Sequence, residues 1–374
     1  MAAESGISSW LSTVGSVWVW LVRGARRCLE AFGGVSTRIS GSGFVLADNF
    51  RGWEDSGLPP DSPGTVLTVG TFDGVHQGHQ RVLGEIARRA ADTGLHSVLL
   101  TFEPHPLEIV NPEKAPQLLT IGAEKLEIVA ESGVGYMAIM PFTPALRDYS
   151  AAQFVDEILR RRFHVRELVI GYDHHFGRGR EGRVEVLQEL GRQRGFRVDV
   201  IRAVTGENEQ PVSSSNIRKA VVSGDLEKAA LGLGRPYSIS GVVLTGEGRG
   251  RLLGFPTINL GAPHPRKLLP PTGVYAVRAH TRAGAFGGMM NLGPRPTFGD
   301  SVTTIEAHLF EAEADFHGSP VKLEFIHRIR STTSFASPEA LVTQLRRDAD
   351  DARRALTLFG EASNVQVSPA HPIH

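Results

Sequence analysis

The stretch TVLTVGTFDGVHQGHQ, residues 65–80, combines a short apolar run, three glycines and two histidines. Its first part, Thr65–Val69, is typical of a short buried β-strand. Beyond the stretch, apolar side chains recur at helical spacing from Val82 to Ala90, and Gly94 supplies a common helix end. These residues therefore predict a strand, a glycine-rich turn and the start of a helix.

Strand and helix patterns continue to alternate up to about residue 204. Further strands are predicted at Ser97–Phe102, Tyr136–Met140, Glu167–Gly171 and Phe196–Val204, and further helices from about Ser150 and across Val184–Gly191. Because strands separated by helices are joined by crossover connections, we expect a parallel sheet covered on both faces. In such α/β sheets, ligands bind at the carboxyl ends of the strands.

The pattern changes near Gly232, where extended segments begin to be separated by glycine- and proline-rich turns. These predicted strands are Tyr237–Leu244, Gly273–Ala279, Thr304–Phe310 and Val321–Ile329. They favour an antiparallel sheet or a small barrel. A closing helix is predicted to follow, because Ser337 and Pro338 supply an N-cap and a first-turn proline before an apolar face that includes Leu341, Leu345, Ala349, Ala352 and Leu356.

The size and composition of the chain suit two globular domains, since it has 374 residues of which 41% are hydrophobic and 21% charged. We expect an extension over residues 1–47, one domain over 48–230, a second over 231–360 and a tail over 361–374. The apolar run Ser8–Val22 is shorter than the ~20 residues that span a bilayer as a helix. Basic residues follow this run, which is the wrong order for a secretory signal. We interpret the extension as accessory and disordered or peripheral, with a peripheral membrane helix as the alternative.

Charge and cysteine content narrow the range of partners. Lysine plus arginine equals aspartate plus glutamate, at 40 each, so there is no global basic field for nucleic acid. An anionic ligand must then be bound locally. The single cysteine, Cys28, excludes an intrachain disulfide and a cysteine-based zinc cluster, and it fits a cytoplasmic location.

The predicted turn after residue 69 is suited to phosphate. A glycine-rich turn that enters a helix presents backbone N–H groups and the positive end of the helix. His76 and His79 are three residues apart, on the same side of the first helical turn, and can donate hydrogen bonds to a triphosphate. Two alternatives are a metal site, for which the motif lacks a cysteine or an acidic pair, and histidines that only cap the helix or lie on the surface.

The histidine motif resembles the HxGH signature of the nucleotidylyltransferase superfamily, and the string GTFDGVH, residues 70–76, is similar to that of the prokaryotic bifunctional riboflavin kinase/FAD synthetase family. The resemblance implies a Rossmann-like adenylyltransferase domain that converts FMN and ATP to FAD and pyrophosphate. It also implies a riboflavin kinase-like antiparallel β-barrel with a closing helix, which converts riboflavin to FMN. Mg²⁺ and ATP are the implied cofactor and co-substrate, and the implied partners are small molecules; the oligomeric state stays open.

For the first domain, the resemblance implies that His76 and His79 are catalytic. The segments GYDHHFGRGR (171–180) and VSSSNIR (212–218) resemble further family signatures, with His174 where phenylalanine is common and Ser215 in place of threonine. The implied ATP-binding residues are Gly70, Thr71, Phe72, Asp73, Gly74, Gly78, Asp173, Arg178, Ser213, Ser214, Ser215 and Arg218. The implied flavin-binding residues are Phe102, Pro104, Pro106, Phe142 and Phe176. Pro116–Thr120 and Lys125 match other family positions.

For the second domain, GEGRGRLLGFPTIN (246–259) resembles the flavokinase signature. The implied ATP-binding residues are Gly248, Gly250, Gly254, Pro256, Thr257 and Asn259. Thr257 and Asn259 are two apart on a predicted strand, hence on one face, and the resemblance makes them Mg²⁺ ligands. Glu306 is the implied catalytic base, following the matched segment Asn291–Phe298. Asp315–Gly318 departs from the usual DLYG of the family.

Three other functions are alternatives to this one. Another HxGH adenylyltransferase, acting on nicotinamide mononucleotide or phosphopantetheine, has no reason to carry PTIN together with Glu306. A non-catalytic flavin-binding protein has no reason to retain the histidines, Thr257, Asn259 and Glu306. A monofunctional member of the family is the third alternative.

Overall fold

The computed structural model describes residues 18–21, 58–172, 177, 181–202, 211–246, 248–294 and 303–365. Contacts divide the chain into two compact units, Met1–Val212 and Ser213–His374. Our predicted boundary lies at 230/231. The division by contacts instead groups two helices, α8 (Ser214–Ser223) and α9 (Leu226–Leu233), with the second unit. One reason is that α9 packs on strand β12 (Pro320–Arg330) of that unit.

The first unit contains a six-stranded sheet in the order β1-β4-β3-β2-β5-β6. Strands β2 to β6 pair in parallel, which confirms the predicted α/β class. The strands are β1 (Trp18–Leu21), β2 (Thr65–Val69), β3 (His96–Glu103), β4 (Tyr136–Pro141), β5 (Val165–Gly171) and β6 (Arg197–Ile201). The last of these is shorter than the predicted strand Phe196–Val204, whose end lies outside the described residues.

Strand β1 belongs to the segment that we predicted as an extension. It pairs antiparallel with the edge of β4, with Trp18 opposite Ile139 and Leu21 opposite Tyr136. Its sequence, WVWL, is aromatic and apolar and so favours a strand. This pairing covers a row of backbone groups along β4 that would otherwise form the sheet edge.

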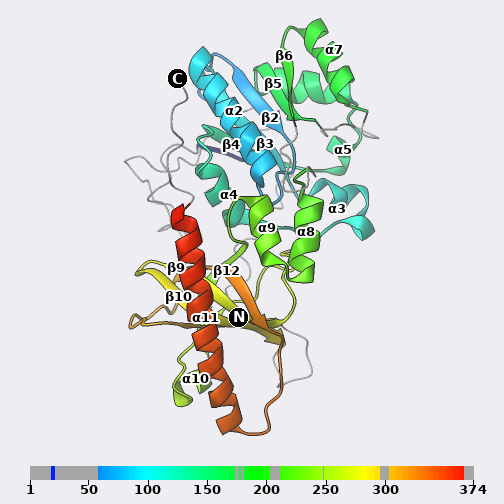
Figure 1. Ribbon diagram of the computed structural model, residues 1–374. Helices are drawn as coiled ribbons and strands as arrows, with labels where there is room; N and C mark the ends of the chain where they lie inside the picture. Colours follow the sequence, from blue (N-terminus) through cyan, green and yellow to red (C-terminus); the bar gives the residue numbers. More distant parts are fainter. Residues whose placement is uncertain are drawn as a thin grey trace. The chain divides into compact units, whose positions relative to one another are not determined.

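Helices cover both faces of this sheet, as predicted. Figure 1 shows α2 (Gln77–Thr93) lying along β2 and β3. Its apolar face packs with Val66 and Leu99 on one face of the sheet, while Ile158 packs with Leu67 and Val98 on the other. The remaining helices are α3 (Pro106–Val110), η2 (Pro112–Lys114), α4 (Gly122–Ala130), α5 (Pro144–Arg147), α6 (Ala151–Gln153), η3 (Phe154–Arg160) and α7 (Val184–Arg194). The helix predicted from Ser150 is α6, and it continues as the π-helix η3.

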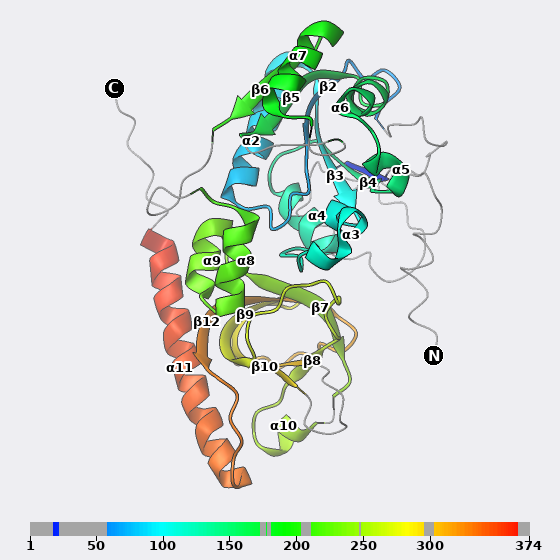
Figure 2. The same ribbon diagram turned by 90° about the vertical axis from the view of Figure 1, so that its right-hand side faces the viewer.

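The second unit contains a closed antiparallel barrel, which confirms the arrangement that the family resemblance implied. Its order is β10-β11-β8-β7-β12-β9, and Figure 2 shows it viewed into its open end. The strands are β7 (Ser238–Leu244), β8 (Ile258–Leu260), β9 (Gly273–Thr281), β10 (Gly284–Pro294), β11 (Thr303–Leu309) and β12; the short helix α10 (Arg249–Leu252) lies between β7 and β8.

Strand β10 was not predicted, because its glycines read as a turn. The packing of the barrel explains why glycines occupy this strand. A methyl group at Gly288 would come within 2.6 Å of the His308 carbonyl oxygen, and one at Gly287 within 2.8 Å of Leu356 Cδ1. Close contact with β11 and with the closing helix therefore favours glycine at these positions.

The closing helix, α11 (Pro338–Val365), confirms the prediction and packs along the barrel beside β9, β10 and β12. Ala349 and Ala352 are buried against Phe310 and Ile326. Residues 361–365 of the predicted tail continue this helix. Among the described residues, no helix is both long and apolar enough to cross a membrane.

Candidate active sites

The turn between β2 and α2 places both predicted histidines at the start of the helix. Phe72 and Val75 adopt left-handed backbone conformations, with φ of +47° and +39°. His76 is the N-cap of α2, and its Nδ1 accepts a hydrogen bond of 3.3 Å from the backbone N–H of His79. Since Nδ1 is the acceptor, the proton of the neutral ring lies on Nε2. Nε2–H of His76 is therefore a donor suited to a ligand.

The two imidazoles lie against each other. The His76 and His79 rings are stacked with centroids 3.7 Å apart, and the Phe72 ring lies 4.5 Å from that of His79. The pKa of His79 is held well below its usual value of 6.5, mainly because the ring is buried and also because His76 and Lys125 are nearby. His79 is therefore neutral at neutral pH.

His79 also has an unsatisfied polar atom. Its Nδ1 is buried and has no hydrogen-bond partner among the described residues. Buried polar atoms are rarely left without one. A ligand that enters the turn could supply that partner, and the role of His79 in binding substrate stays a prediction.

Asp73 connects the turn to the segment before α4. Its buried carboxylate accepts hydrogen bonds from the backbone N–H groups of Leu119, at 2.9 Å, and Thr120, at 3.1 Å. In return, the Thr120 hydroxyl accepts from Gly74 N–H at 3.0 Å. The structure thus gives Asp73 an anchoring role that the sequence did not reveal, and its contact with ATP stays a prediction.

Part of the predicted flavin segment is brought together at the carboxyl ends of β3 and β4. Phe102 and Phe142 are partly buried and meet edge to face, with ring centroids 5.5 Å apart. Phe142 N–H donates to the Glu103 carbonyl at 3.1 Å. Pro104 follows β3, and Pro106 begins α3. Phe176, Asp173 and Arg178 lie outside the described residues.

The serine signature begins at the boundary of the two units. Ser213 is the N-cap of α8, and its Oγ accepts from Asn216 N–H at 3.3 Å. Ser214, Ser215 and Arg218 lie in that helix. Val212, the residue before Ser213, lies close to the histidine turn: its carbonyl oxygen is 4.0 Å from the position that a Cβ would occupy on Gly78. That the serines and the histidines bind one triphosphate stays a prediction.

The barrel brings the predicted kinase residues together through strand register. Glu306 on β11 lies directly opposite Asn259 on β8, and on its other side it lies opposite Asn291 on β10. Residues opposite one another in an antiparallel pair share a face. Asn291 was not assigned a role from the sequence, although it begins a segment that resembles the family. Only the pairing of three strands reveals that it neighbours Glu306.

The glycine-rich loop lies against the other predicted kinase residues. A methyl group on Gly246 would come within 2.1 Å of Asn259 Nδ2, and one on Gly250 within 3.2 Å of Thr257 Oγ1. His308 Nδ1–H on β11 donates to the Pro256 carbonyl at 2.8 Å. The loop, the threonine, the asparagine and the neighbouring glutamate thus form one group rich in oxygen ligands.

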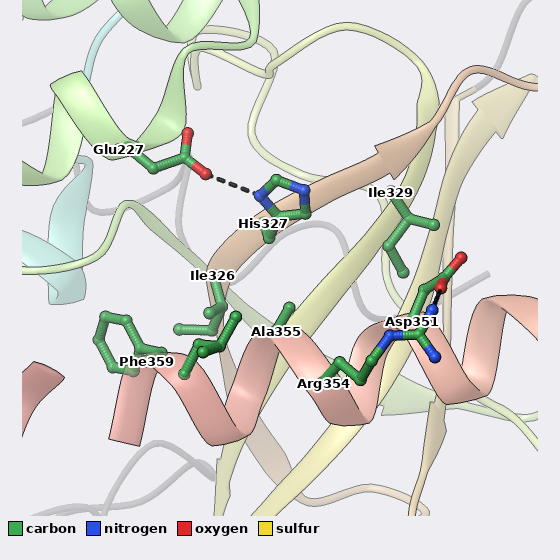
Figure 3. A pocket seen from close by; sticks show the side chains of 9 residues that line it. Glu227, Ile326, His327, Ile329, Asp351, Arg354, Ala355 and Phe359 are labelled. Carbon is green, nitrogen blue, oxygen red and sulfur yellow. Dashed lines mark hydrogen bonds and ion pairs between the residues drawn. The ribbon is translucent and has the colours of Figure 1, made fainter. Parts of the chain in front are cut away.

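A hollow of about 530 Å³ lies elsewhere in the second unit, between α9, β12 and α11 (Figure 3). Its charged residues are paired with each other: Glu227 with His327 at 2.8 Å, and Asp351 with Arg354. Its apolar lining residues are Ile326, Ile329, Ala355, Leu358 and Phe359. None of the predicted site residues lines this hollow. Across the described parts of the chain, no three histidine, cysteine, aspartate or glutamate residues are grouped so as to hold a metal.

Comparison with known proteins assigns each unit. Residues 58–216 match the FAD synthetase family and residues 233–356 match the riboflavin kinase family. Bifunctional riboflavin kinase/FMN adenylyltransferases from Pseudomonas fluorescens and Escherichia coli K12 are 38% and 36% identical to this chain, over 79% and 78% of it and 94% and 92% of their own lengths. A crystal structure named as a macrolide-efflux protein from Streptococcus pneumoniae aligns with a TM-score of 0.71 and 27% identity, covering 80% of this chain and 97% of that one.

The fold and the comparisons thus define a two-domain transferase, with a nucleotidyltransferase domain followed by a flavokinase barrel. Within that class, the chain belongs to the family of bifunctional riboflavin kinase/FMN adenylyltransferases.

Proposed function

We propose that this chain makes both flavin cofactors. The second unit phosphorylates riboflavin with ATP to give FMN, and the first unit joins FMN to the AMP part of a second ATP to give FAD and pyrophosphate. The observation that supports the proposal is that each unit has its own glycine-rich turn beside the side chains predicted to act there: the stacked histidines in one, and Glu306 opposite Asn259 in the other. Two ATP-consuming reactions require two such turns.

In the first unit, an FMN phosphate oxygen attacks the α-phosphorus of ATP, and the bond to the bridging oxygen of pyrophosphate breaks. Negative charge grows on the phosphate oxygens as this happens. His76 donates from Nε2 and His79 binds beside it, so hydrogen bonds already in place stabilise the charge. No covalent intermediate is needed. The edge-to-face pair Phe102 and Phe142 offers an aromatic surface for the isoalloxazine ring.

In the second unit, the ribityl 5′-hydroxyl of riboflavin attacks the γ-phosphorus of ATP, the bond from that phosphorus to the β,γ-bridging oxygen breaks, and ADP leaves. Glu306 accepts the hydroxyl proton, and the loop around Gly248, Gly250 and Gly254 covers the phosphates. The hydroxyl of Thr257 and the amide oxygen of Asn259 are hard ligands that suit Mg²⁺, and the close approach of Gly246 keeps the group compact. When bound, Mg²⁺ supplies positive charge that offsets the charge of the phosphate oxygens.

The cytoplasm is the compartment that we propose, because ATP is available there and the single cysteine fits a reducing environment. The binding partners would be riboflavin, FMN, FAD and ATP.

The test is to incubate the full chain with riboflavin, ATP and Mg²⁺ and to follow FMN and FAD by chromatography, with a second reaction started from FMN. FMN appearing before FAD, and FAD forming from added FMN, would support both activities. A monofunctional family member would give one product only, and a flavin-binding protein would give neither while still shifting the flavin fluorescence.

A further inference from the structure

A lysine ammonium lies beneath the turn that carries the histidines. Lys125 is on α4, and its Nζ donates a 3.0 Å hydrogen bond to the Thr71 carbonyl oxygen. The same oxygen accepts from the Thr101 hydroxyl on β3 at 3.1 Å. Thr71 is therefore tied both to the sheet and to α4.

The hydrogen bond from Lys125 to Thr71 lies close enough to His79 to affect its position. Thr71 directly precedes Phe72, whose left-handed backbone is disfavoured for a non-glycine residue by roughly 1–2 kcal/mol and so needs support from its surroundings. The Phe72 ring in turn packs against the His79 ring, with centroids 4.5 Å apart. A continuous series of contacts therefore connects the Lys125 ammonium, through Thr71 and Phe72, to the His79 imidazole.

We propose that Lys125 is a positioning residue for adenylyl transfer, which holds the β2–α2 turn through the Thr71 carbonyl and so aligns the His79 ring. This inference rests on the proposed function of the first unit. Lys125 acts through Thr71 and Phe72, with its ammonium bonded to the protein backbone, so it differs from the residues predicted to bind ATP directly.

The charge of Lys125 adds a second effect. Burial is the largest cause that lowers the pKa of His79, and the neighbouring His76 and Lys125 lower it further. The pKa of Lys125 is itself lowered by burial, while Asp73 and Glu103 oppose that shift and favour the ammonium form. Removing the lysine charge should therefore raise the pKa of His79 toward its ordinary value, whatever happens to the turn.

Three substitutions separate the two effects. Lys125→Met removes the donor and the charge, Lys125→Gln keeps an amide donor without the charge, and Lys125→Arg keeps both. Lys114→Met is the matched control, because Lys114 is exposed on the neighbouring η2 segment. All are made in the full chain, with circular dichroism and a thermal melt to show that the first unit folds and formation of FMN from riboflavin to show that the second unit does.

We expect kcat for FAD formation from FMN to fall roughly 10–10²-fold in Lys125→Met, the scale of a displaced reactive group, with KM for ATP little changed. The fall in kcat should be smaller in Lys125→Gln and smallest in Lys125→Arg. In the unliganded protein, NMR titration of the His79 ring should show a higher midpoint in Lys125→Met and Lys125→Gln, but not in Lys125→Arg or Lys114→Met.

Unchanged kcat with an unchanged His79 midpoint would overturn the proposal, and so would a raised KM for ATP at normal kcat, which marks a direct ATP contact. If Lys125→Met fails to fold, a comparison of Lys125→Gln with Lys125→Arg in the same measurements still decides between these outcomes. If the wild-type chain makes no FAD at all, the proposed function fails, whereas the titration still tests whether Lys125 acts on His79.

Discussion

Glu306 on β11 lies directly opposite Asn259 on β8, held there by the ladder of a closed barrel. A predicted base and a predicted metal ligand that are 47 residues apart in sequence thus become neighbours through backbone pairing. Because both are on strands, their positions depend little on loop motion. Strand β11 is also paired to β10 on its other side, so Asn291 completes a polar row of three.

Replacing the predicted base tests the kinase assignment. Glu306→Gln should lower formation of FMN from riboflavin by ~10²–10⁴-fold, the usual range for loss of a general base, because the ribityl hydroxyl is a poor nucleophile at neutral pH. FAD formation from added FMN should stay normal in the same preparation. Near-normal FMN formation would remove the base assignment, and loss of both activities would indicate misfolding or coupled domains.

A glycine in the kinase loop offers a steric test. Gly246→Ala would place a methyl group within 2.1 Å of Asn259 Nδ2, so we expect Asn259 to move and FMN formation to fall roughly 10–10²-fold. Gly360→Ala is the matched control: nothing lies within 4 Å of its Cβ position on α11, and alanine in a helix should stabilise by up to about 1 kcal/mol. Equal kinetics in the two variants would show that the loop does not depend on this close approach.

The histidine pair can be separated from its capping role. His76→Ala and His79→Ala should each lower FAD formation by roughly 10²–10³-fold while sparing FMN formation. His76→Asn should keep the N-cap of α2, since an asparagine oxygen can accept the same backbone hydrogen bond, yet it should remain impaired in FAD formation. Full activity in His76→Asn would mean that His76 only caps the helix.

Stability should depend on pH through His79. Its pKa is lowered in the folded chain, so between the folded pKa and about 6.5 the unfolded chain binds more protons than the folded one. The contribution of His79 to stability is therefore fully present above pH 6.5 and is lost as the pH falls through the folded pKa. Urea unfolding across this range should show a shallower pH dependence in His79→Gln than in the wild type. Parallel curves would mean that His79 titrates normally in the folded chain.

Removal of the N-terminal segment tests the predicted extension. A chain that begins near Asp48 keeps both family matches, which cover residues 58–216 and 233–356, so both activities should persist. The truncation also removes β1 from the edge of β4. We expect a lower melting temperature as a result, by roughly 2–4 °C for each 1 kcal/mol lost. Loss of FAD formation alone would show that this strand supports the predicted flavin-binding residues at the carboxyl end of β4.

Sequence and structure agree most closely where the pattern is local. The strand Thr65–Val69, the helix that ends before Gly94 and the capped helix after Ser337 all follow from side-chain periodicity and from residues that start or stop helices. Strand β10 was not predicted, because glycine has a low intrinsic preference for strands. Its glycines are favoured by close contacts with residues that are distant in sequence, such as His308 and Leu356, and local propensity takes no account of such contacts.

The sequence by itself determined the two-domain organisation, the class of each domain and the histidine, glycine-loop and glutamate motifs, because each depends on short-range spacing or on recognisable residue strings. Only the tertiary structure decided that Asn291 borders Glu306, that Asp73 binds backbone amides of Leu119 and Thr120, and that Lys125 reaches Thr71. Register and burial produce these contacts. Both arise only when distant segments pack, since a one-residue shift in strand pairing would turn every side chain to the opposite face.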